Sequence, residues 1–167
     1  MHDDARSLDV LVVGDTNLDL VLRGDVVPRF GQVEQLVDAA DLVLAGSAGI
    51  VAAGTARLGL RTGLVAHLGL DGFGDAVLTA LAERGVDTSA VARHDDTPTG
   101  LSVILSRPGD RAILTFAGAL ARLIPDDVPD ALLARARHVH VAGWFLIPGL
   151  AAGGTRLLAS ARARGCT

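Results

Sequence analysis

The sequence contains no lysine, because all 15 of its basic residues are arginines. A phosphate-binding loop of the GxxxxGK type needs its lysine, so that class of site is excluded. Cys166 is the one cysteine, which excludes an internal disulfide and a cysteine-based zinc cluster. The sequence also lacks an apolar run long enough and free enough of charge to span a bilayer.

Basic runs are absent as well, and the formal net charge is −4. Both features argue against nucleic acid as a partner. The first six residues carry His2, Asp3 and Asp4 in place of a basic stretch followed by an apolar core. This start argues against a secretory signal and favours a cytoplasmic protein. The glycine-rich stretch 143–154 lacks the GxGxxG spacing, which disfavours a nicotinamide-binding Rossmann protein.

What is present indicates one soluble globular domain with a real core, since half of the 167 residues are hydrophobic and a fifth are charged. Apolar runs predict buried strands, and helical spacing of apolar residues predicts helices between them. The strands are expected at 8–13, 62–68 and 137–142, and the helices at 48–58, 73–84, 125–135 and 150–164. Alternation of strands and helices predicts an α/β fold with a parallel sheet.

Several extended segments do not fit this alternation. They are expected at 18–22, 32–37, 42–44, 101–105 and 112–116, the last two joined as a hairpin by the turn 107–110. We therefore assign the segments near 19–37 and 90–116 to a small second sheet.

The stretch 45–74 organises the chain, because it combines small residues, a buried helix, a strand and two glycine-rich turns. A helix that begins near Ala48 would offer unpaired N–H groups to a ligand, but tight helix–sheet packing selects the same small residues. Polar residues also follow the first strand directly, where open α/β sheets place their ligands. These are Asp15, Thr16, Asn17 and Asp19.

With these motifs in order, the chain resembles the N-terminal half of the PfkB (ribokinase-like) family of sugar and nucleoside kinases. The resemblance covers about residues 8–164. It rests on 12–15 with Asp19, on 45–48 and 56–59, on 69–74, on 85–88 and on 98–100. It implies a ribokinase-like three-layer α/β/α fold with a mostly parallel central sheet and a small β-lid. Residues 1–167 would form a partial kinase domain with lid segments at about 18–44 and 90–117, its C-terminal part missing.

The resemblance also implies substrate-binding residues. Asp19 would accept hydrogen bonds from substrate hydroxyls, and an ionised carboxylate can take two such donors. Gly46 and Ser47 would let the sugar lie against the backbone, with Thr99 and Gly100 contributing from the lid. Ile50 stands where the family usually has an asparagine that bonds the sugar. This change disfavours ribose-like or fructose-like substrates and leaves a less polar polyol or a nucleoside.

An intact family member would use ATP and Mg²⁺. The family's Gly-Ala-Gly-Asp turn, which carries the catalytic base and anion hole, is absent from these residues, as is its Asn-x-x-Glu motif. No catalytic residue is therefore assigned, and the chain alone is expected to be inactive because phosphoryl transfer needs those groups. The alternative is a non-catalytic module that binds a small polyol or forms a homodimer through its lid strands, since exposed strand edges recruit other chains.

Other chemically capable residues favour structural interpretations. Two histidines on one strand are too few for a metal site, which needs three or four ligands. A pair of acids at the start of a helix interacts favourably with the helix dipole. Aromatic residues after a strand either stack on a substrate or pack in the core. These residues are His138 with His140, His67, the segment 94–96, Asp126 with Asp127, and Trp144 with Phe145; Cys166 has no visible base partner.

Overall fold

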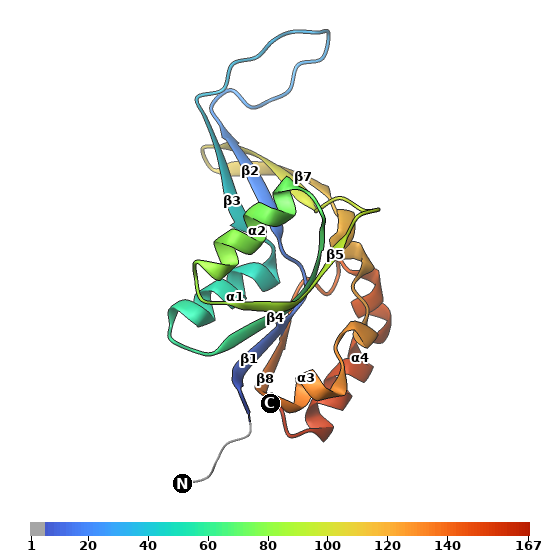
Figure 1. The fold of residues 1–167 in the computed structure, drawn as a ribbon. Helices are drawn as coiled ribbons and strands as arrows, with labels where there is room; N and C mark the ends of the chain where they lie inside the picture. Colours follow the sequence, from blue (N-terminus) through green and yellow to red (C-terminus); the bar gives the residue numbers. More distant parts are fainter. Residues whose placement is uncertain (1–5) are drawn as a thin grey trace.

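The computed structural model describes residues 6–167, so the N-terminal signal interpretation lies largely outside the described residues. The described chain forms two four-stranded sheets (Figure 1). Sheet A is the central one, and sheet B, the lid, lies beyond the carboxyl ends of the sheet A strands. Among residues 6–167 there is no helix of the length and apolarity that crossing a membrane would require.

Sheet A has the strand order β5-β4-β1-β8, and all of its neighbouring strands run parallel. Its strands are β1 (Leu8–Val13), β4 (Thr62–Gly69), β5 (Asp87–His94) and β8 (Ala136–Val141). β1 and β4 are buried along nearly their whole length, as continuous apolar runs in a two-sided parallel sheet are expected to be.

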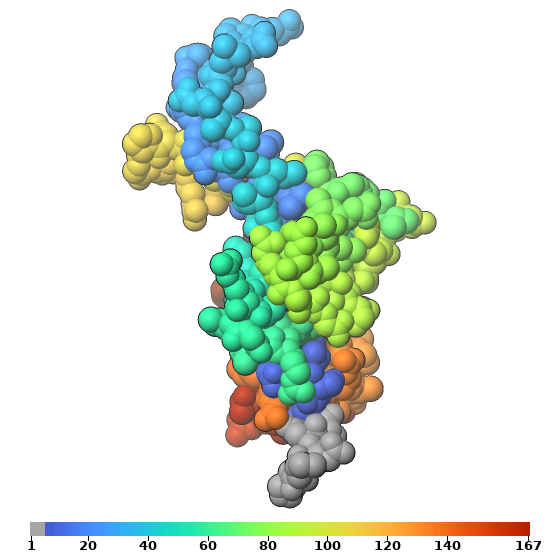
Figure 2. Space-filling model, turned by 60° about the vertical axis from the view of Figure 1, so that its left-hand side comes forward, coloured from blue at the N-terminus to red at the C-terminus, as the bar shows by residue number. Residues whose placement is uncertain are grey.

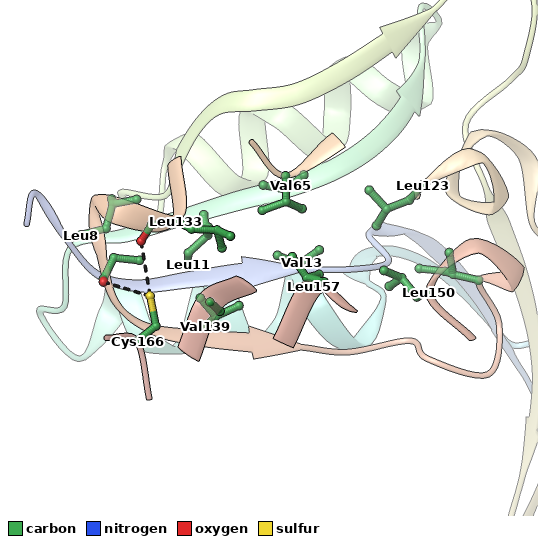
Figure 3. Close-up of a cluster of buried hydrophobic side chains, with 14 of the residues drawn as sticks. Leu8, Leu11, Val13, Val65, Leu123, Leu133, Val139, Leu150, Leu157 and Cys166 are labelled. Carbon is green, nitrogen blue, oxygen red and sulfur yellow. Dashed lines mark hydrogen bonds between the residues drawn. The ribbon is translucent and has the colours of Figure 1, made fainter. Parts of the chain in front are cut away.

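Helices cover both faces of sheet A, which confirms the three-layer prediction (Figure 1). α1 (Ser47–Arg57) and α2 (Gly72–Ala82) pack on the face that Val10 and Val12 present. α3 (Asp130–Ala134) and α4 (Pro148–Ala163) pack on the opposite face. Figure 3 shows Leu11 and Val13 of β1 among the side chains from that second layer. Successive residues of β1 thus supply two separate cores, as the period of two in a strand requires.

The one cysteine belongs to this second core. Cys166 is buried, and its thiol donates to the backbone oxygens of Leu133, at 3.3 Å, and Ala136, at 3.4 Å (Figure 3). Its neighbour Thr167 pairs with β8 through two backbone hydrogen bonds: Val139 N–H donates to Thr167 O, and Thr167 N–H donates to Arg137 O. The thiol is therefore part of the packing of this core, beside the outer edge of β8.

The lid has the strand order β3-β2-β6-β7. Its strands are β2 (Asn17–Arg23), β3 (Ala39–Ala45), β6 (Leu101–Arg107) and β7 (Asp110–Phe116). β6 and β7 form the predicted hairpin, and β2 runs parallel to β6 and antiparallel to β3. Figure 2 shows the lid and its long β2–β3 loop standing away from the body of the molecule. The resemblance therefore anticipated the second sheet correctly.

The structure differs from the expected elements in three places. Residues 32–37 form a loop, and β3 runs through Asp41, where a break was expected. The predicted helix 125–135 is a 3₁₀ turn, η2 (Pro125–Asp127), followed by α3, because the residue before Pro129 is biased away from helical geometry. Residues 90–94, expected in the lid, pair with β4 as part of β5. The lid therefore begins at Leu101 on that side.

Candidate functional site

Asp15 lies just beyond the carboxyl end of β1 and holds the N-terminus of α1. It is 4% exposed, and its Oδ2 accepts from Ser47 N–H at 2.9 Å while its Oδ1 accepts from Ala48 N–H at 3.2 Å. Its backbone oxygen accepts from Gly49 N–H at 3.0 Å. A carboxylate at this position satisfies helix N–H groups and interacts favourably with the helix dipole. The chain therefore fixes α1 directly onto the end of the central strand.

Gly46 makes this close approach possible. Its φ is +82°, a backbone conformation that favours glycine, and it precedes the first residue of α1. A Cβ at this position would lie 2.6 Å from Asp15 O and 2.6 Å from Thr16 Cα. The backbone of the β3–α1 turn therefore lies against the segment that leaves β1.

A row of polar side chains lies at the base of the lid. Asn17 is buried, and its Nδ2 lies 3.2 Å from Asp19 Oδ1 and 3.3 Å from Ser102 Oγ. Ser102 Oγ is in turn 3.1 Å from Thr115 Oγ1. Asp19 pairs with Ser102, and Ser102 with Thr115, so these side chains share one face of the sheet. Asp19 itself is half-buried, which leaves carboxylate oxygen available to a ligand.

A hollow of about 360 Å³ lies beside the N-terminus of α1. It is lined by Ser47, Val141, Ala142, Gly143, Trp144, Phe145 and Leu146. Gly143 packs so closely on Asp15 that a Cβ there would lie 2.4 Å from Asp15 Oδ1. Phe145 is 96% exposed, whereas Trp144 is half-buried against α4 at Gly154. Of the two aromatic candidates, Trp144 packs on the fold and Phe145 faces outward.

The structure places the six predicted substrate residues at three places. Gly46, Ser47 and Ile50 lie together at the start of α1, where Ile50 is 59% exposed, and Asp19 lies at the base of the lid on β2. Thr99 and Gly100 lie elsewhere, in the segment that enters β6. Thr99 is 1% exposed, and its hydroxyl is engaged with Asp71 and Gly69. Thr99 thus contacts the β4–α2 turn.

Two polar residues of this site, Ser102 and Thr115, were not singled out from the sequence. Asn17 was named there among the polar residues after the first strand, and it lies two residues before Asp19, so both share one face of β2. Ser102 and Thr115 are symmetric about the turn of the predicted hairpin, so its register places them opposite each other. Their proximity to Asn17 depends on the parallel pairing of β2 with β6, which no local pattern in the sequence encodes.

A second polar cluster lies apart from this row. His67 of β4 is 6% exposed, with its Nε2 3.2 Å from Asp127 Oδ2 and its Nδ1 3.1 Å from His94 Nε2. Burial lowers the pKa of His67, and the nearby His94 and Arg122 lower it further, against the opposing effect of Asp127. His94, at the start of the segment 94–96, is the last residue of β5. Within residues 6–167, no three histidine, cysteine or acidic side chains are grouped so as to hold a metal ion.

The free energy of unfolding is expected to fall as the pH drops from about 7 toward 5, with His67 contributing to the fall. A histidine in the unfolded chain has a pKa of about 6.5, and the pKa of His67 in the folded chain is lower. The unfolded state therefore binds more protons in this window, and stability rises with pH. Urea unfolding at several pH values measures this slope.

A His67→Gln variant should show a shallower slope, and His138→Gln, at an exposed position on β8, is the matched control. An unchanged slope in His67→Gln would remove His67 as a source of the pH dependence.

A family model described as pfkB family carbohydrate kinase matches residues 7–167. The 2-dehydro-3-deoxygluconokinase of Bacillus subtilis is 36% identical over 104 residues, which are 60% of this chain and 32% of that protein. The crystal structure of a PfkB protein from Polaromonas sp. JS666 superposes with a TM-score of 0.81 at 30% identity. The match covers 96% of this chain and 54% of the Polaromonas chain.

Xylella fastidiosa fructokinase with bound ATP superposes with a TM-score of 0.79 at 23% identity, a likeness that shows the fold alone. That match covers 95% of this chain and 50% of the fructokinase. The chain therefore spans about a third of the curated relative and about half of the solved neighbours.

Proposed function

This chain belongs to the pfkB family of carbohydrate kinases, with the ribokinase-like fold, and we propose that it supplies the substrate-binding half of an ATP-dependent sugar or nucleoside kinase. The complete enzyme would transfer a phosphoryl group from ATP to a substrate hydroxyl. The observation that carries the proposal is the polar row at the base of the lid, where Asp19 stays half-buried beside Asn17 and Ser102.

In this proposal Asp19 accepts hydrogen bonds from two substrate hydroxyls, since an ionised carboxylate offers acceptor sites alone. The Asn17 amide donates toward Asp19 and holds that carboxylate in place. Gly46 and Ser47 present the start of α1 to the substrate, while the buried Thr99 and its neighbour Gly100 hold the segment that enters β6. Ile50 offers an exposed apolar surface, which favours a substrate with fewer hydroxyls on that side.

The residues of this chain do not fit an ATP–Mg²⁺ site. The sequence has no lysine, no Gly-Ala-Gly-Asp turn and no Asn-x-x-Glu motif. The described residues 6–167 bring together no set of three metal-ligating side chains. The catalytic base, the anion hole and the magnesium-linked residues would therefore come from outside this chain, which is expected to be inactive alone. The ATP-bound fructokinase neighbour supports nucleotide binding by the complete enzyme.

Loss of the Asp19 carboxylate is expected to weaken substrate binding at least about tenfold, because a charge-assisted hydrogen bond is lost. Titration calorimetry of the chain with a panel of deoxy sugar acids, polyols and nucleosides would first identify a ligand. The same titration would then compare Asp19→Ala with Asp110→Ala, a control that removes an exposed lid carboxylate at the far end of the hairpin. Unchanged affinity in Asp19→Ala would overturn the assignment of Asp19.

The alternative function is a non-catalytic module that pairs through its lid. One face of the lid is apolar across all four strands, with Leu20, Leu42, Val103 and Leu114 in a single register row. Leu42 is 51% exposed and Leu114 is 61% exposed. Sedimentation distinguishes the two functions: a dimer that binds no sugar favours the module, whereas substrate binding lost in Asp19→Ala favours the kinase half.

A further inference from the structure

Two chain segments connect the β6–β7 hairpin of the lid to the body, and they meet at one place. Residues 95–100 enter β6, and residues 117–118 leave β7. Ala119 N–H donates to Pro98 O at 2.8 Å, which ties the leaving segment to the entering one. Both covalent connections of this hairpin to the body therefore pass through this crossing.

The crossing is anchored to the β4–α2 turn by one carboxylate. Asp71 Oδ2 accepts from Thr99 N–H at 2.8 Å, and Asp71 Oδ1 accepts from the Thr99 hydroxyl at 2.7 Å. The same Oδ1 accepts from Gly74 N–H at 2.8 Å, which makes Asp71 the N-cap of α2. One side chain thus joins a segment 28 residues away to the start of a helix of the body.

Thr99 completes the anchor on its other side. Gly69 N–H, at the end of β4, donates to Thr99 Oγ1 at 2.9 Å. The approach is so close that a Cβ on Gly69 would lie 2.4 Å from Thr99 N. Burial opposes the ionised form of Asp71, but the hydrogen bonds from Thr99 and Gly74 outweigh this effect, and the pKa of Asp71 lies below its ordinary value. The anchor therefore contains an ionised acceptor with three donors.

The anchor lies close to the polar row of the candidate site along the chain. Ser102 follows Thr99 by three residues at the start of β6, and its hydroxyl lies 3.3 Å from Asn17 Nδ2, beside Asp19. Because β6 is paired with β2, with Ser102 opposite Asp19, a shift of Thr99 would strain this pairing and displace Ser102, and with it Thr115. The position of the hairpin beside Asp19 therefore depends on the anchor as well as on the β2–β6 pairing.

We infer that Asp71 is a positioning residue of the sugar site: through Thr99 it fixes the pivot that helps to set where β6 and β7 lie beside Asp19. Asp71 touches Thr99 and Gly74, and its effect on a substrate passes through Ser102. The inference rests on the proposed function for its consequence in binding, but the pivot itself is a property of the chain alone.

Asp71→Asn tests the pivot while keeping the helix cap. Asparagine is a good N-cap residue, so its side-chain oxygen can still accept from Gly74 N–H. Its amide group would face the Thr99 N–H with a donor in place of an acceptor, so this bond is lost and the link to Thr99 is weakened to the bond between the Thr99 hydroxyl and Oδ1. Asp75→Asn is the matched control, because Asp75 lies in the first turn of α2 and is exposed, with Arg93 as its ion-pair partner.

Hydrogen–deuterium exchange of the full chain, without ligand, gives the readout. We expect the amides of β6 in Asp71→Asn to exchange about tenfold faster than in the unmodified chain, with those of β1, β4 and β8 unchanged, since local opening exposes one unit at a time. Asp75→Asn should leave β6 unchanged. An equal rise across both sheets, or no rise in β6, would overturn the inference.

Thr99 offers a second test should Asp71→Asn fail to fold. Thr99→Val removes the hydroxyl and should accelerate exchange in β6, whereas Thr99→Ser retains the hydroxyl and should restore protection. Equal exchange in the two variants would contradict the pivot.

The binding arm follows if titration finds a ligand. Asp71→Asn should then weaken its affinity about fivefold while Asp75→Asn does not, and unchanged affinity would show that the pivot does not position the site. An absence of binding by the unmodified chain counts against the proposed function alone, because the exchange result decides the pivot separately.

Discussion

A Gly46→Ala variant is expected to lose about 3 to 5 kcal/mol of unfolding free energy, because strain and overpacking act together at this position. The new methyl group would lie 2.6 Å from both Asp15 O and Thr16 Cα, which are backbone atoms that cannot rotate away. The φ of +82° adds strain for any residue with a Cβ. Urea unfolding followed by circular dichroism measures the loss.

Gly54→Ala is the matched control for this substitution. Gly54 lies inside α1, and a Cβ there would meet nothing within 4 Å. Alanine in an open helix position should stabilise the chain by about 0.5 to 1 kcal/mol relative to glycine. The two alanines, eight residues apart along one segment, should thus shift stability in opposite directions. Similar losses in both variants would contradict the close-approach explanation.

An Asp15→Ala variant is expected to lose about 2 to 4 kcal/mol, because it removes a helix cap and leaves buried donors without an acceptor. Ser47 N–H and Ala48 N–H both donate to this carboxylate, and Ala48 is fully buried. The Ser47 N–H lies at the surface, so the loss arises chiefly from the buried Ala48 N–H and from the cap itself. The unfolding free energy, again from urea titration, reports the change.

Two further variants separate the role of Asp15 from charge alone. Asp15→Asn keeps one acceptor oxygen and should lose about half as much, since one of the two N–H groups stays paired. Asp75→Ala removes an exposed acid in the first turn of α2 and should lose less than about 1 kcal/mol, as surface ion pairs contribute little. Equal losses for Asp15→Ala and Asp75→Ala would show that the cap of α1 by Asp15 contributes no more stability than a surface ion pair.

These two positions also link stability to the proposed function. Gly46 and Asp15 hold the start of α1 where the resemblance places the substrate, so a variant that loosens this turn should weaken ligand binding as well as folding. Asp19, by contrast, is half-buried on the lid and lies outside both cores. The calorimetric test of Asp19 therefore separates recognition from folding better than either of these variants.

Local patterns in the sequence determined much of the fold. The apolar run 8–13 is β1, the run 62–68 lies within β4, and the turn 107–110 joins β6 to β7, as predicted. These elements depend on contacts close in sequence and on runs of apolar or turn-forming residues, which the order of residues in the sequence records directly. The resemblance to the PfkB family, carried by several motifs in order, is confirmed by the family model that matches residues 7–167.

Tertiary structure decided what pairs with what. Residues 90–94 have the composition of a lid strand, yet they join sheet A because β4 offers a parallel edge there. The meeting of Asn17 with Ser102, and of Asp71 with Thr99, joins segments far apart in the chain. Such contacts arise when whole elements pack, and a local pattern cannot encode them because a strand presents the same alternation to any neighbour that it meets.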